Sequence, residues 1–281
     1  TVVVSDNEIR KYYDDHKKFF KQQASRDIEY VVYEVVPSDS DVAAANDALV
    51  KVYDEFAEAE NMKSFLLANS DRTYDPSWYA EGQLTAFSKD INDFVFGKDN
   101  KGVSQVFQSG NTFYAARVIE EAMVPDSVYV KFVPAASENV DSLLTVSEPM
   151  WLPQTAGFED LMTVKKGEKF TTGGITFQVV DRTAPVAKKR VAILQKNAVA
   201  SKETVNGYYA QANTLATKSA GDYDKFQAAC TEEGVYAHPV NRMLESASVL
   251  GSIEHTKEVT RWAFEAKVGD VSNIITVDNN Y

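Results

Sequence analysis

Cysteine is almost missing from this sequence of 281 residues, where it occurs once, as Cys230. A single cysteine excludes an internal disulfide and any zinc or iron–sulfur site built from several cysteines, and it leaves the redox compartment open. Cys230 follows Phe226 on an expected helix and is interpreted as a small buried apolar residue. The histidines His16, His238 and His255 are too scattered to suggest a metal centre, and the last two are interpreted as loop residues. We therefore expect no metal and no cofactor.

Positive charge is also scarce, because 29 Lys and Arg stand against 41 Asp and Glu and give a net charge of −12. This is the wrong sign for a surface that must displace counterions from phosphates, so nucleic acid is not an expected partner. No apolar run reaches the roughly 18 residues of a membrane span, and no basic-then-apolar signal opens the sequence.

Helix and strand patterns alternate along the chain and predict an α+β fold. Ser5 and Glu8 form a capping box before a helix that is expected to reach about residue 21. β-branched and aromatic residues at 28–36 predict a strand, and Pro37 ends it. Apolar residues at helical spacing between 42 and 56 then predict a helix.

The same order of elements returns along the sequence and indicates tandem modules. A strand is predicted at 28–36, at 127–133 and at 189–194, and each module ends with a glycine turn and an aromatic strand. These aromatics are Tyr114, Phe177 and Tyr281. We expect an N-terminal helical region at 1–25 and modules at 26–124, 125–185 and 186–281, with the last ending inside its final strand. The short middle module is expected to dock on a neighbour through Trp151, Leu152 and Phe158.

The order of strand, long helix, short helices, glycine turn and closing hairpin resembles the parvulin family of peptidyl-prolyl isomerases. The motifs that carry the resemblance are Gly82-Gln83-Leu84, Phe94-Val95-Phe96 and Gly102-Val103-Ser104 in the first module, and Leu250-Gly251, Trp262-Ala263-Phe264, Gly269-Asp270-Val271-Ser272 and Asn280-Tyr281 in the last. The opening residues resemble the helix before the parvulin domain in the SurA/PpiD group of periplasmic foldases, and 26–38 resemble PpiD-type chains of Bacteroidetes. The resemblance covers about 1–124 and 186–281 and is weak between them.

The resemblance implies tandem parvulin-like modules, but this sequence departs from the family at its catalytic floor. Parvulins carry one histidine on the first strand of the domain and another on the last. The first-strand positions here hold Tyr30, Phe132 and Ala192, and the last-strand positions hold Tyr114, Phe177 and Tyr281. No catalytic residue is therefore assigned, and we expect little or no isomerase activity in these modules.

Seven aromatic residues are candidates for contacting a peptide: Tyr30, Trp78, Tyr79, Phe94, Tyr114, Trp262 and Tyr281. Aromatic side chains offer a large contact area at a low entropic cost. Each residue has a simpler interpretation as part of a hydrophobic core, which is favoured for Tyr30, Tyr114 and Tyr281 and evenly balanced for Trp78 and Tyr79.

The resemblance implies a periplasmic foldase or chaperone segment that binds extended or unfolded polypeptides, with outer-membrane proteins as candidate clients. It also implies a membrane anchor outside this sequence. Two alternatives stay open: an active peptidyl-prolyl isomerase, and a scaffold or adaptor whose modules space other domains.

Overall fold

The computed structural model describes residues 4–154 and 157–281 and divides the chain into two compact units. Unit 1 joins the N-terminal segment up to Val36 to residues 200–281, and unit 2 is Pro37–Val199. Both units combine helices with antiparallel sheets, so the predicted α+β class is confirmed. Within the described ranges, no helix is both long enough and apolar enough to cross a bilayer.

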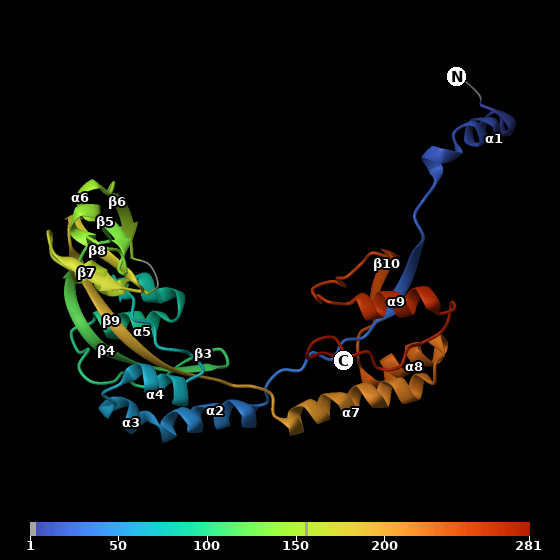
Figure 1. The fold of residues 1–281 in the computed structure, drawn as a ribbon. Helices are drawn as coiled ribbons and strands as arrows, with labels where there is room; N and C mark the ends of the chain where they lie inside the picture. The colour runs from blue at the N-terminus through green and yellow to red at the C-terminus, as the bar shows by residue number, and fades with distance from the viewer. Residues whose placement is uncertain (1–3, 155–156) are drawn as a thin grey trace. The chain divides into compact units, whose positions relative to one another are not determined.

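Unit 2 is built around a sheet with the order β2-β9-β4-β3. Its strands are β2 (Trp78–Tyr79), β3 (Phe107–Ser109), β4 (Thr112–Val124) and β9 (Val186–Asn197). One face packs against α2 (Asp39–Lys51), α3 (Tyr53–Glu58) and α4 (Met62–Asn69), and the other packs against η2 (Gln83–Ala86) and α5 (Lys89–Phe96). Figure 1 shows β9 running beside β4 through this sheet.

The middle of the chain forms a second sheet in unit 2, with the order β6-β5-β8-β7. Its elements are β5 (Ser127–Pro134), α6 (Val140–Val146), β6 (Met150–Pro153), η3 (Glu159–Thr163), β7 (Lys169–Thr172) and β8 (Ile175–Arg182). Trp78 and Val124 of the first sheet are buried in the core of this second sheet, together with partly buried Leu152 and Phe158. Trp151 is 49% exposed, so Trp78 supplies the central contact that had been expected of Trp151.

Unit 1 contains a sheet of two strands, β1 (Ser25–Tyr30) and β10 (His238–Leu244). One face contacts α7 (Lys202–Ser219) and α8 (Tyr223–Glu233), and the other contacts α9 (Lys257–Glu265). The N-terminal helix α1 (Asp6–Asp15) begins with the expected capping box. It ends earlier than predicted, and η1 (Lys17–Phe20) follows it.

Two strands lie in a different unit from the one that the sequence modules predict. Residues 28–36 were predicted to be the first strand of module 26–124, and 189–194 that of module 186–281. In the structure β1 pairs with β10 in unit 1, whereas β9 lies between β2 and β4 in unit 2. Each strand therefore completes the fold of the other module, and the compact units differ from the expected module boundaries.

Matching hairpins show that β1 and β9 occupy equivalent places. In unit 2, Thr112 follows a two-residue turn after Ser109 and lies opposite Asn197 of β9. In unit 1, Asn280 follows a two-residue turn after Val277 and bridges to Glu34. Glu34 therefore corresponds to Asn197, and each residue of β1 can be compared with its counterpart in β9.

This comparison gives a physical reason for the exchange. Counting back from the matched pair aligns Glu29 with Ala192 and Tyr30 with Ile193, so the sequence-based match of Tyr30 with Ala192 was wrong by one residue. Ala192 has no exposed surface, and Ile193 is 4% exposed. If residues 28–36 took the place of β9 in unit 2, the Glu29 carboxylate would be buried and the Tyr30 phenol would be forced into a site that fits a smaller apolar side chain. Both changes are unfavourable.

Candidate functional site

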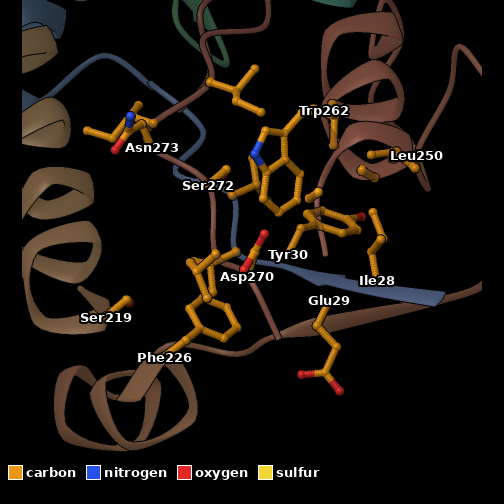
Figure 2. Close-up of a pocket in the computed structure, with 18 of the residues that line it drawn as sticks. Ile28, Glu29, Tyr30, Ser219, Phe226, Leu250, Trp262, Asp270, Ser272 and Asn273 are labelled. Carbon is orange, nitrogen blue, oxygen red and sulfur yellow. The ribbon is translucent and has the colours of Figure 1, made fainter. Parts of the chain in front are cut away.

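A cavity of about 480 Å³ lies within unit 1, between the edge of β1 and the two helical layers. Its walls come from β1, from one side each of α7, α8 and α9, and from the segment 266–281. Figure 2 shows Tyr30, Trp262 and Leu250 gathered on one side of β1, with Phe226 and Ser219 on the other. This volume is in the range of small-ligand and peptide pockets.

Local structure holds these side chains in place. Asp222 caps α8 by accepting a hydrogen bond from the Lys225 amide, and this cap sets the start of the helix that carries Phe226. Gly251 has φ +59°, and a Cβ at this position would lie 3.0 Å from the Tyr30 hydroxyl. Glycine is therefore required both for this backbone conformation and for the close approach of Tyr30.

Three of the seven predicted contact residues, Tyr30, Trp262 and Tyr281, line this cavity. Tyr281 exchanges two backbone hydrogen bonds with Tyr33, at 2.7 and 3.1 Å, and its ring contacts Tyr209 of α7. The short pairing with Tyr281 lies just beyond the end of β1. The rest of that edge of β1 faces the cavity.

The other four predicted residues belong to unit 2 and do not line the cavity. Trp78 is 1% exposed in the core between the two sheets. Phe94 and Tyr114 are packed on the α5 face of the first sheet. The Tyr79 hydroxyl donates to Asp75 at 2.5 Å, and burial together with this carboxylate raises the pKa of Tyr79. These four residues support the core of unit 2 in this structure.

The structure also corrects two residue assignments made from the sequence. His238 is the first residue of β10 rather than a loop residue, and its ring stacks on that of Tyr30 at 5.3 Å. The hairpin positions make Tyr281 the counterpart of Phe113 rather than of Tyr114. The last module has one additional residue between its glycine turn and its hairpin. The equal separation of glycine and tyrosine in the two modules concealed this difference.

The cavity has aromatic and apolar side chains on both sides of β1. The resemblance placed Tyr30 and Tyr281 where the family carries imidazoles, and the hairpin positions remove this equivalence for Tyr281. In the described ranges no cluster of three or more His, Cys, Asp or Glu side chains could hold a metal ion. Cys230 is buried on α8, and burial raises its pKa, which keeps its thiol protonated.

An exposed ion pair connects the loop before α9 to the hairpin that leads into Tyr281. His255 Nδ1 lies 3.1 Å from Asp278 Oδ2, and this hydrogen bond, with the charge of Asp278, raises the pKa of His255 above the ordinary histidine value of 6.5. A raised pKa in the folded state means that the pair stabilises the hairpin below pH 6.5 and that this contribution is lost as the pH rises through the folded pKa.

We expect the His255 imidazole to titrate above the ordinary histidine pKa, and Asp278→Asn to return it to the ordinary value. A proton NMR titration of the His255 ring in the wild type and in Asp278→Asn measures both. Identical titrations of His255 in the wild type and in Asp278→Asn would show that the pair does not form in solution.

Comparison with known families gives a match over the first part of the chain. The sequence model of the PPIC-type PPIase domain (Rotamase_2) matches residues 4–126. Searches of curated proteins and of solved structures found no match. The matched range runs from α1 through β1 to the end of β4, so it includes the strand that the fold places in unit 1. Residues 4–126 therefore carry the sequence of a PPIC-type PPIase domain, which supports a place for this protein in the parvulin family.

Proposed function

We propose that the protein is a foldase segment that binds extended or unfolded polypeptide in the cavity of unit 1 and does not catalyse prolyl isomerisation in the modules seen here. The observation that carries this proposal is the cavity of unit 1, whose walls carry the aromatic side chains of Tyr30, Phe226 and Trp262. The PPIC-type match is consistent with a protein that handles polypeptide chains.

The lining favours neutral, aromatic or aliphatic clients. Arg26 and Lys267 offset part of the charge of Asp27, Glu29 and Asp270 around the cavity, so no strong field selects charged segments. Tyr30 and Trp262 supply contact area with few rotatable bonds. Segments of outer-membrane strands fit this description, and we assign the protein to the periplasmic SurA/PpiD-like foldases on this basis and on the motif resemblance.

We expect binding without catalysis because of the side chains at the expected catalytic positions. An isomerase must favour the twisted amide across a barrier of about 18–20 kcal/mol, which requires polar groups aimed at the rotating bond. Tyr30 holds the expected first-strand position, Tyr281 lies one residue before the expected last-strand position, and His238 lies on β10 outside the cavity lining.

We expect Trp262→Ala to weaken the binding of an unfolded, fluorescein-labelled outer-membrane-type peptide by roughly 5- to 30-fold, since truncating a buried aromatic contact costs about 1–2 kcal/mol. Fluorescence anisotropy with the full chain measures this, and Trp151→Ala is the matched control because Trp151 is exposed in unit 2. Binding should persist at moderate salt. If peptide binding is lost at moderate salt, and if Trp262→Ala binds the peptide as tightly as the wild type does, the peptide binds through charge at another site.

A protease-free assay on a proline peptide separates the two alternative functions. Little or no turnover together with peptide binding supports a foldase without catalysis. Turnover comparable to that of an active parvulin would establish an isomerase, and absence of both binding and turnover would favour a scaffold.

A further inference from the structure

We infer that unit 2 carries a second contact for polypeptide clients, a surface groove beside α2 that takes one aromatic side chain of the client. This α2 groove has a volume of about 450 Å³ and lies between α2 and the β3–β4 hairpin, which are neighbours in Figure 1. The inference rests on the proposed function only for the kind of partner, an unfolded polypeptide, because the groove is formed by unit 2 alone. Its floor consists of Val42, Val106 and Phe113, and its rim of Asp39, Asn46 and Gln108.

The floor of the α2 groove is apolar and its rim is polar. Phe113 belongs to the core under α2, and the partly buried Val42 and Val106 pack against that core. At the rim, Asp39 is exposed and Asn46 is half-buried. A hollow with an apolar floor and a few polar groups at its edge is the usual form of a site for a small ligand or a single side chain.

The residue match between the two units continues from the strands into the helices that follow them. Ser38 is the N-cap of α2 and Ser201 is that of α7, and both lie at the same distance from the matched strand residues. The two helices therefore align without a gap, and Asn46 of α2 corresponds to Tyr209 of α7.

In unit 1 the Tyr209 ring occupies the place that corresponds to the α2 groove. It meets the Tyr281 ring edge-on, with the ring centroids 5.4 Å apart, and Tyr281 is the counterpart of Phe113. Edge-to-face ring pairs at such a separation stabilise a contact beyond the area that they bury. In unit 2 the shorter side chain of Asn46 leaves this space open as the α2 groove. An aromatic side chain of a client, placed on Phe113, would restore the packing that unit 1 has.

The charge at the rim selects the neighbours of that aromatic residue. Asp39 contributes an exposed carboxylate to the rim. Lys196 lies opposite Phe113 on β9, but its ammonium group is paired with the Asp71 carboxylate at 3.7 Å, which leaves the rim acidic. An acidic client segment would be repelled there. The partner is therefore an aromatic residue within a neutral or basic segment of an unfolded polypeptide.

The test titrates the full chain with the acetylated and amidated tripeptide Lys-Tyr-Lys and follows the side-chain amide of Gln108, on the rim, by NMR. Asn46→Tyr places the unit 1 residue in the groove, and this tethered ring should compete with the peptide and weaken its binding roughly 10-fold or more. Asp47→Tyr is the matched control, because it adds the same ring at the next, exposed position of α2, and it should change binding less than about twofold. Equal effects of the two variants would overturn the inference.

Changes in the peptide test the selectivity and do not depend on the fold of a groove-filling variant. The tripeptide Lys-Leu-Lys should bind about fivefold more weakly than Lys-Tyr-Lys, because leucine lacks a ring to set edge-on to Phe113. Glu-Tyr-Glu should also bind more weakly, and Asp39→Asn should reduce this second difference by about half or more, because it removes the carboxylate from the rim. A leucine peptide that binds as tightly as the tyrosine peptide would contradict the inference.

The outcomes separate this inference from the proposed function, which is measured with the fluorescein-labelled client and Trp262→Ala. If the client binds in a Trp262-dependent way but the tyrosine peptide leaves the Gln108 signal unchanged, the inference is wrong and the proposed function remains. If the peptide shifts the Gln108 signal as expected but Trp262→Ala leaves client binding unchanged, the α2 groove stands and the site proposed in unit 1 fails. A Gln108 signal that shifts with protein concentration alone, together with dimer formation, would show that a second copy fills the groove, which also overturns the inference.

Discussion

A fragment of residues 37–199 is expected to fold cooperatively by itself, whereas a fragment of residues 26–124 is expected to stay unfolded. The first fragment contains a complete compact unit. The second follows the module boundaries of the sequence but lacks β9, the strand that lies between β2 and β4.

The size of this effect comes from the position of β9. Ala192 and Leu194 have no exposed surface and fill the core under α2 and α4, while Val191 and Ile193 fill the opposite face. Removing the strand exposes both cores and leaves the long edge of β4 unpaired, a loss larger than the whole stability of about 5–15 kcal/mol that domains of this size have.

Circular dichroism and urea titration of the two fragments measure the difference. A single cooperative transition is expected for 37–199 and none for 26–124. Adding a synthetic peptide of residues 186–197 to the second fragment is the control, because it returns the missing strand and should induce structure. Cooperative folding of 26–124 alone would show that residues 28–36 can replace β9, and the exchange of strands would then be optional.

Trp78→Ala is expected to lower the free energy of unfolding of unit 2 by about 3–5 kcal/mol, the usual cost of truncating a fully buried large aromatic residue. Trp78 lies in the core shared by the two sheets, its ring is 4.4 Å from the Arg190 guanidinium carbon, and its backbone N–H and C=O both bond to the Gln154 amide, at 3.0 and 3.2 Å. The middle sheet should then separate from the first.

Hydrogen exchange of β5 in the full chain measures this separation, because its amides should lose protection in Trp78→Ala. Trp151→Ala is the matched control: that ring lies 5.0 Å from the Tyr129 ring, tilted against it, and is half exposed, so its loss should cost less than about 1 kcal/mol. Trp78→Phe should fall between the two. Similar protection in Trp78→Ala and Trp151→Ala would mean that the sheets are held together by other contacts.

Much of the fold was predictable from local pattern. The capping box at Ser5 and the apolar spacing of α2 follow from short stretches of sequence, and the structure contains both. The partner of each strand was not predictable in this way. Residues 28–36 and 189–194 have the same strand character, and the difference between them is how Glu29 and Ala192 fit a particular core, which is tertiary information.

The candidate site was partly predictable for the same reason. Aromatic content pointed to Tyr30, Trp262 and Tyr281, which do meet at the cavity. It pointed equally to Trp78, because an aromatic residue in a core and one in a binding site have the same sequence signal. Phe226 and Leu250, which line the same cavity, were missed as site residues, because an apolar side chain has the same sequence signal in a core.

The exchange of strands also affects the order in which the protein can be made. Tyr30 pairs with His238, so the first strand emerges from the ribosome about 200 residues before its partner. At synthesis rates of 5–20 residues per second, β1 waits on the order of 10 to 40 s while the whole of unit 2 is produced. Unit 2 can complete its sheet once β9 has emerged, and unit 1 can do so only after β10 has emerged. The N-terminal segment is therefore an early aggregation hazard, and a cell would benefit from keeping it covered during synthesis.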